Sequence, residues 1–130
     1  MGIKIRNQTR NTVVCEEACL ADSFCKRARG LMFRSRWEGL DGLLLSPCGS
    51  IHTMGMRMQI DVCFLDPELR VLRALACVGP WRLAHGGTDS QATLELPAGT
   101  LERTGTKAGD FLVMDERVKR GCTPSGSVED

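Results

Sequence analysis

The segment SIHTMGMRMQIDVCFLD, from Ser50 to Asp66, gathers side chains whose types could carry out chemistry. It holds a histidine, an arginine and a carboxylate close together in sequence, at His52, Arg57 and Asp61. Histidine titrates near neutral pH, and a carboxylate can act as an acid or a base when its surroundings shift its pKa. Such a set is typical of an acid–base site or of a pocket for a polar ligand.

The pattern of polarity along this segment predicts one strand with two unlike faces. Successive side chains of a strand point to opposite faces. The even-numbered residues from His52 to Phe64 are almost all apolar, which predicts a core face. The other face carries four polar side chains, Thr53, Arg57, Gln59 and Asp61. We therefore expect this second face to meet water or a ligand where the strand begins and to be buried where it ends.

Two further arginines favour a ligand pocket beside that face. Arg27 and Arg34 lie at and after the end of a predicted helix, and arginine binds carboxylate and phosphate groups through two parallel hydrogen bonds. The predicted ligand pocket consists of six residues, Arg27, Arg34, His52, Thr53, Arg57 and Asp61. No residue is assigned a catalytic role.

The elements that must position these residues are short. Alternating or β-branched runs predict further strands at 3–7, 12–15, 42–46, 69–78, 92–96 and 111–114. A helix is predicted between residues 22 and 30, and a second, shorter one at 98–104, with Gly105 as its end. The content of Gly, Pro and Ser predicts a loop at 79–91.

About seven short strands favour a sheet that curls to protect its edges. The predicted fold is mainly β, of the α+β class: a small closed or strongly coiled antiparallel barrel, with one packed helix and a second short helix. The chain of 130 residues suits a single domain over residues 1–118. Residues 119–130 have little to bury and are expected to form a flexible tail.

Composition narrows the classes of function. Lys and Arg number 17 and Asp and Glu 16, so no overall charge directs the chain to nucleic acid or to an anionic membrane. No apolar stretch is long enough for a membrane span, and basic residues interrupt the N-terminus, so a cytoplasmic location is expected. The seven cysteines include no C-x-x-C pair, which favours reduced packing cysteines, with no metal and no cofactor.

Several motifs occur in an order that resembles the domain-of-unknown-function family 192 (DUF192) of bacteria and archaea. They are KRARGLMFRS, LDGLLLSPCGSIHTMGMRMQIDVCFLDPELRVL, GPWR, TLELPAG and AGDFLVM, and they run from about Leu20 to Met114. The resemblance implies a small β-barrel with a helix and no particular reaction. It marks seven residues as structural motif positions, Gly30, Leu31, Met32, Glu95, Gly99, Gly109 and Asp110. Glu95 is expected to be solvated or paired.

Three functions are compatible with the sequence. The favoured one is a non-enzymatic binding module for a small polar or anionic ligand or for a protein partner. A hydrolase-type enzyme using His52 and Asp61 is the first alternative, although a continuous strand places those residues on opposite faces. RNA binding through the basic segment 26–36 is the second, although that segment offers few aromatic side chains for stacking on bases.

Overall fold

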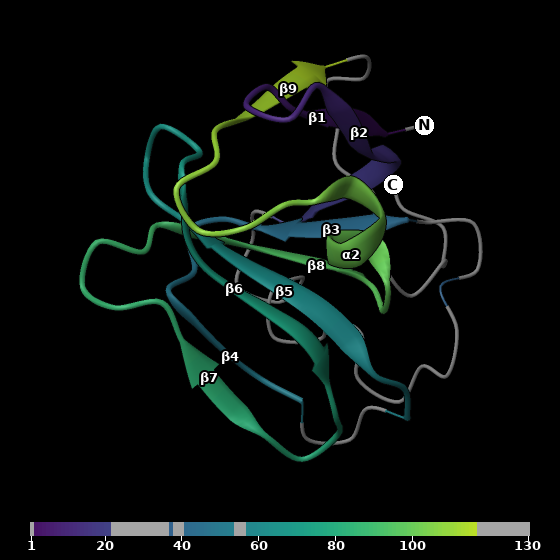
Figure 1. The fold of residues 1–130 in the computed structure, drawn as a ribbon. Helices are drawn as coiled ribbons and strands as arrows, with labels where there is room; N and C mark the ends of the chain where they lie inside the picture. Colours follow the sequence, from purple (N-terminus) through teal and green to yellow (C-terminus); the bar gives the residue numbers. More distant parts are fainter. Residues whose placement is uncertain (1, 22–36, 38–40, 54–56, 117–130) are drawn as a thin grey trace, which may run out of the picture.

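The computed structural model describes residues 2–21, 37, 41–53 and 57–116 (Figure 1). The strands within them are β1 (Ile3–Asn7), β2 (Thr12–Ala21), β3 (Gly42–Leu45), β4 (Ser50–His52), β5 (Ile60–Leu65), β6 (Val71–Val78), β7 (Leu83–His85), β8 (Ala92–Pro97) and β9 (Leu112–Glu116). Helix α2 spans Thr100–Thr104. The predicted helix at 22–30, the tail at 119–130 and the motif residues Gly30, Leu31 and Met32 lie outside the described residues.

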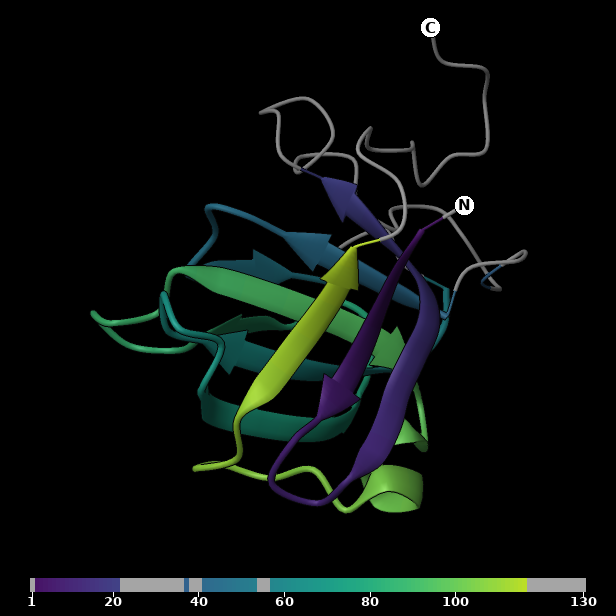
Figure 2. The same cartoon turned by 90° about the horizontal axis from the view of Figure 1, so that it is seen from above.

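Seven strands form one curled sheet in the order β6-β5-β8-β3-β2-β1-β9. Figure 2 shows β9, β1 and β2 crossing over the layer that contains β8 and β5. The segments that lead into the two edge strands, β6 and β9, pair at an isolated bridge between Arg70 and Phe111. The predicted strongly coiled, mainly β fold is confirmed, but the sheet is a half-barrel, so closure was overstated. The pairing is also not wholly antiparallel, because β2 and β3 run parallel, joined by a long connection.

Each face of this sheet carries its own buried apolar cluster. The first cluster includes Ile5, Val14, Cys63, Leu65, Leu94, Leu96 and Leu101. The second includes Leu43, Leu45, Ile60, Val62 and Phe64, with Trp37 and Ala84 packed against it. Strand β5 lies between β6 and β8 and contributes alternate residues to each cluster, so all six of its residues are buried.

The predicted strand at 51–65 is in fact two strands in two different sheets. Strand β4 pairs with β7 in a separate two-stranded sheet, whereas β5 belongs to the large sheet. The alternation of faces therefore does not carry across residues 53–59. The loop predicted at 79–91 is corrected too, because its residues 83–85 form β7. Three residues are too few to show an alternation, and their pairing partner comes from a distant segment.

The short helix predicted at 98–104 is confirmed as α2, with Gly105 in the left-handed conformation at its C-terminal end (φ 74°). Gly99 precedes the helix with a φ of 99°, which a residue without a Cβ adopts at little cost. Gly99 is the N-cap residue and has no side chain to cap the helix. The first N–H groups of α2 therefore depend on an acceptor from another element.

A buried polar network joins β1 to the loop that precedes β9. The Asp110 carboxylate accepts hydrogen bonds from Asn7 Nδ2 (2.9 Å), Arg10 Nε (3.0 Å) and the Lys107 N–H (3.1 Å). Asn7 also donates to Thr106 Oγ1 at 3.0 Å. Burial acts to raise the pKa of Asp110, but the hydrogen bonds from Arg10, Asn7 and Lys107 together hold it below its usual value. The motif residue Asp110 thus connects β1, the turn that contains Arg10 and the loop before β9.

Replacing Asp110 with alanine is expected to lower the free energy of unfolding at pH 7 by about 2–3 kcal/mol, because three donors lose a charged acceptor. A carboxyl whose pKa is lowered by folding stabilises the protein above its unfolded-state pKa, and this contribution is lost as pH falls through the folded-state pKa. Urea unfolding at several pH values checks this, with Asp115→Ala as the surface control. A loss in Asp110→Ala that matches the control would contradict it.

The cysteines differ from the expectation that all are reduced. Cys19 is disulfide-bonded. Four described cysteines are free thiols, Cys15, Cys48, Cys63 and Cys77. Burial raises the pKa of Cys63 to about 12, with the nearby Asp61 adding to the shift. Burial, followed by the charge of Asp41, raises the pKa of Cys15 still further. Both buried thiols are therefore packing groups and not nucleophiles.

Candidate functional site

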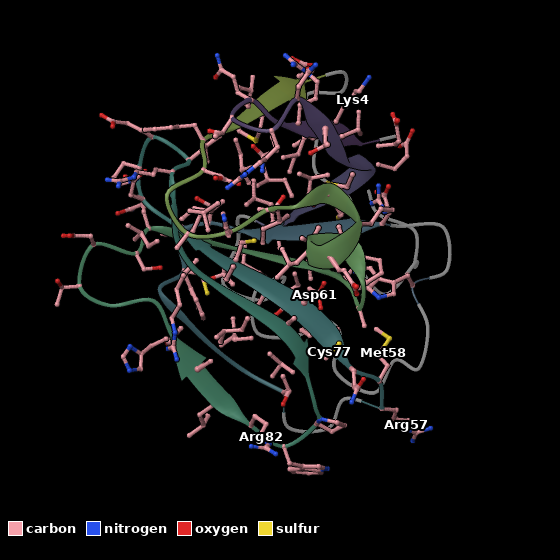
Figure 3. All side chains as sticks on the ribbon, viewed as in Figure 1. Lys4, Arg57, Met58, Asp61, Cys77 and Arg82 are labelled. Atoms are coloured by element: carbon pink, nitrogen blue, oxygen red, sulfur yellow. The ribbon has the colours of Figure 1, made fainter. Side chains whose placement is uncertain are left out.

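Asp61 lies on β5 with its side chain toward α2, and it is fully buried (Figure 3). Its Oδ1 accepts the Cys77 N–H at 2.8 Å. Its Oδ2 accepts the N–H groups of Gly99 (3.1 Å) and Leu101 (2.8 Å). The carboxylate therefore supplies the acceptor that the N-terminus of α2 lacks locally, where the helix dipole favours negative charge.

These contacts give Asp61 a structural role. Its hydrogen bonds join β5, β6 and α2, and no solvent reaches the side chain. A general acid or base must exchange protons with a substrate or water, and this carboxylate instead contacts three fixed backbone donors. The hydrolase hypothesis thus loses the carboxylate on which it depended.

Thr53 is also buried and hydrogen-bonded to the backbone. Its Oγ1 donates to the Gly79 carbonyl at 2.7 Å and accepts the Arg82 N–H at 2.7 Å. Its own N–H donates to the Arg82 carbonyl at 2.8 Å, and its carbonyl accepts the Trp81 N–H at 2.9 Å. Thr53 thus fixes the turn at residues 79–82, here called the Trp81 turn.

The other four members of the predicted pocket are described only in part. Arg57 is exposed, and Figure 3 shows its side chain at the periphery, away from Asp61. The backbone of His52 ends β4, and its side chain is outside the described part of the structure. Arg27, Arg34 and the basic segment 26–36 also lie outside it, so their part in a pocket or in RNA binding stays a prediction.

The described residues contain a different hollow, a groove of about 610 Å³ between β6 and β7. The Trp81 turn joins the two strands at one end (Figure 1). Residues 73–79 line one side and residues 82–85 the other. The sequence showed Arg73, Arg82 and His85 within the segments LRVLRALACV and GPWRLAHGG, but the loop prediction for 79–91 gave no reason to bring them together.

The lining of this β6–β7 groove is cationic. Among the residues that the structure describes, it includes Arg73, Arg82 and His85 and contains no Asp or Glu. The Arg73 Nη1 donates to the His85 carbonyl at 2.8 Å, which connects the two strands at the end opposite the Trp81 turn. The exposed Arg82 side chain has no hydrogen bond or ion pair with any residue that the structure describes. These basic side chains line one groove of a chain whose net charge is +1.

Glu95 departs from the expectation that it is solvated or paired. It is 4% exposed and lies on β8 opposite Leu43 and Val62, so it shares the face of the second apolar cluster. Its Oε1 is buried without a hydrogen-bond partner among the described residues. Burial raises its pKa to about 8. The carboxyl is therefore largely protonated at neutral pH, which lowers the cost of holding it among apolar side chains.

The described residues offer neither a cluster of metal ligands nor a membrane-spanning helix. They contain no group of three or more His, Cys, Asp or Glu side chains that could hold a metal ion. None of the helices in the same part of the chain is long and apolar enough to cross a membrane.

Comparison with known proteins gives the family. The profile of DUF192, described as "Uncharacterized ACR, COG1430", matches residues 4–114, which begins earlier than the predicted resemblance. UPF0127 protein PH1112 of Pyrococcus horikoshii is 35% identical over 111 residues, covering 83% of this chain and 96% of the relative. A UPF0127 protein of Thermococcus sibiricus is 31% identical over 123 residues, covering 92% and 79%.

Two solved structures share the fold. A protein of unknown function from Novosphingobium aromaticivorans superposes with a TM-score of 0.72 at 21% identity, covering 85% of this chain and 82% of the other. A Sinorhizobium meliloti protein, assigned provisionally to transcription regulation, gives 0.74 at 19% identity, covering 86% and 91%. At these identities the likeness concerns the fold alone. The profile match over most of its length and the identity to the archaeal relatives establish that the chain belongs to the DUF192 family.

Proposed function

We propose that this chain is a binding module that holds an anionic ligand in the β6–β7 groove. One observation carries the proposal: three basic side chains, Arg73, Arg82 and His85, line a groove in which the described lining residues include no acidic one. The volume, about 610 Å³, falls in the range of ligand pockets in proteins.

The two arginines support anion binding in different ways. Arg73 is oriented by its hydrogen bond to the His85 carbonyl, and a guanidinium has further N–H groups to offer a ligand. The backbone N–H and carbonyl of Arg82 form hydrogen bonds with Thr53. The N–H groups of its guanidinium are used by no described residue and can bind a ligand. Guanidinium groups bind carboxylates and phosphates through two parallel hydrogen bonds, so each arginine suits such a group.

The test is a titration of isotope-labelled protein with citrate and with inorganic phosphate, followed by backbone NMR. We expect perturbed amides along residues 73–85 and an affinity that weakens with added salt. Arg82→Ala is expected to lower the citrate affinity about tenfold, the equivalent of about 1.4 kcal/mol. Arg6→Ala is the matched control, because Arg6 is a partly exposed arginine of β1 that pairs with Asp115. The proposal would be overturned if neither anion shifted the amide signals of residues 73–85, or if Arg82→Ala bound citrate with unchanged affinity.

A further inference from the structure

We propose that the ligand of the β6–β7 groove is an extended, acidic segment of a partner protein, with an apolar side chain packed against Trp81 and Leu83. This inference rests on the proposed function, because it names the class of ligand that the same groove takes.

The shape of the groove and the position of its charges favour an extended ligand. Strands form both of its walls, and the basic groups lie toward opposite ends. Arg82 is the last residue of the Trp81 turn, whereas His85 and the Arg73 that contacts it are at the other end. Arg82 and His85 are three residue steps apart along the chain, a distance of about 10 Å in extended backbone. A single small anion reaches one end, whereas acidic residues spaced along an extended chain reach both.

Exposed apolar side chains lie beside the cationic groove. Trp81 is 69% exposed and Leu83 is 74% exposed, the two largest exposures among the large hydrophobic side chains that the structure describes. They flank Arg82 in sequence. Tryptophan and arginine are the residues most enriched among those that dominate protein–protein binding. A small anion would leave both apolar side chains in water, whereas a polypeptide can bury them.

The Trp81 turn holds Trp81 in an exposed position through a fixed backbone conformation. Trp81 has a φ of 62°, a left-handed conformation that bulky residues rarely adopt and that costs about 1–3 kcal/mol. The buried Thr53 holds the turn through its hydroxyl and its backbone, at Gly79, Trp81 and Arg82. A side chain presented from a fixed backbone loses less entropy on binding. The hydrogen bonds of Thr53 therefore support an exposed anchor for a partner.

Three acetylated and amidated octapeptides test the inference. One alternates aspartate with leucine, one aspartate with serine, and one lysine with leucine. We expect calorimetry to show the aspartate–leucine peptide binding about tenfold more tightly than the aspartate–serine peptide, and the lysine–leucine peptide not binding. The exposed free thiol of Cys77 lines the groove, so bound peptide should slow its alkylation by iodoacetamide, measured by mass spectrometry.

Trp81→Asn separates this inference from the proposed function. Asparagine tolerates a positive φ, so the turn is retained while the apolar anchor is removed. The variant should lose the tenfold advantage of leucine over serine and keep the wild-type affinity for citrate. Met114→Asn, at an exposed apolar position on β9, should change neither.

The outcomes divide clearly. If citrate binds but leucine gives no advantage, or if Trp81→Asn keeps that advantage, the polypeptide inference is overturned and anion binding stands. If neither citrate nor any peptide binds, both proposals fall. If sedimentation shows a dimer that Trp81→Asn dissociates, a second copy of this chain occupies the surface, and the partner-protein inference is overturned.

Discussion

Replacing Asp61 with asparagine is expected to lower the free energy of unfolding by about 3 kcal/mol or more. The wild-type carboxylate accepts three backbone N–H groups, from Cys77, Gly99 and Leu101. An asparagine side chain has only one acceptor oxygen, so its amide nitrogen must face at least one of these donors without a hydrogen bond. Removal of the negative charge also removes its favourable interaction with the N-terminus of α2.

Chemical denaturation measures this loss, and Asp89→Asn is the matched control. Asp89 is exposed and has no hydrogen bond from its side chain to the residues that the structure describes, so that change should stay within about 0.5 kcal/mol. Amide hydrogen exchange gives a second readout, because the N–H groups of Cys77 and Leu101 should lose protection in Asp61→Asn before the protein unfolds globally. Equal stability of the two variants would show that Asp61 does not carry this junction.

The second large effect is the pH dependence produced by Glu95. Burial raises the pKa of its carboxyl from 4.5 to about 8. Between these values the folded protein retains a proton that the unfolded chain has released. The free energy of unfolding therefore falls by about 1.4 kcal/mol for each unit by which the pH rises in this range. The stabilisation is fully present below pH 4.5 and is lost as pH rises through about 8.

Glu95→Gln should remove this slope, since glutamine resembles the protonated acid and does not titrate. Its advantage over the wild type should grow from about 1 kcal/mol at pH 5 to several kcal/mol at pH 8. Urea unfolding at intervals across this range measures the difference, and Glu68→Gln, at an exposed position, is the control. Stability curves for Glu95→Gln and wild type that stay parallel from pH 5 to pH 8 would refute the prediction, as would an NMR titration midpoint for Glu95 near 4.5.

Local pattern alone determined much of the secondary structure. The alternation in IKIRN and ATLEL, the apolar run GLLL and the left-handed glycine after TLERT gave strands β1, β8 and β3 and helix α2 to within a few residues. These signals are local because side-chain periodicity and glycine conformation depend on neighbouring residues. The order of motifs also indicated the family, which the profile match over residues 4–114 confirms.

What the polar residues do was decided only by the tertiary structure. The sequence made Asp61 and Thr53 candidates for a pocket, yet their hydrogen bonds go to backbone groups of β6, α2 and the Trp81 turn. It made Glu95 a solvated or paired acid, whereas Leu43 and Val62 flank it on both sides. Arg73 and Arg82 line one groove because β7, which pairs with the distant strand β4, lies along it. Burial and partners depend on contacts between distant segments, which no local periodicity encodes.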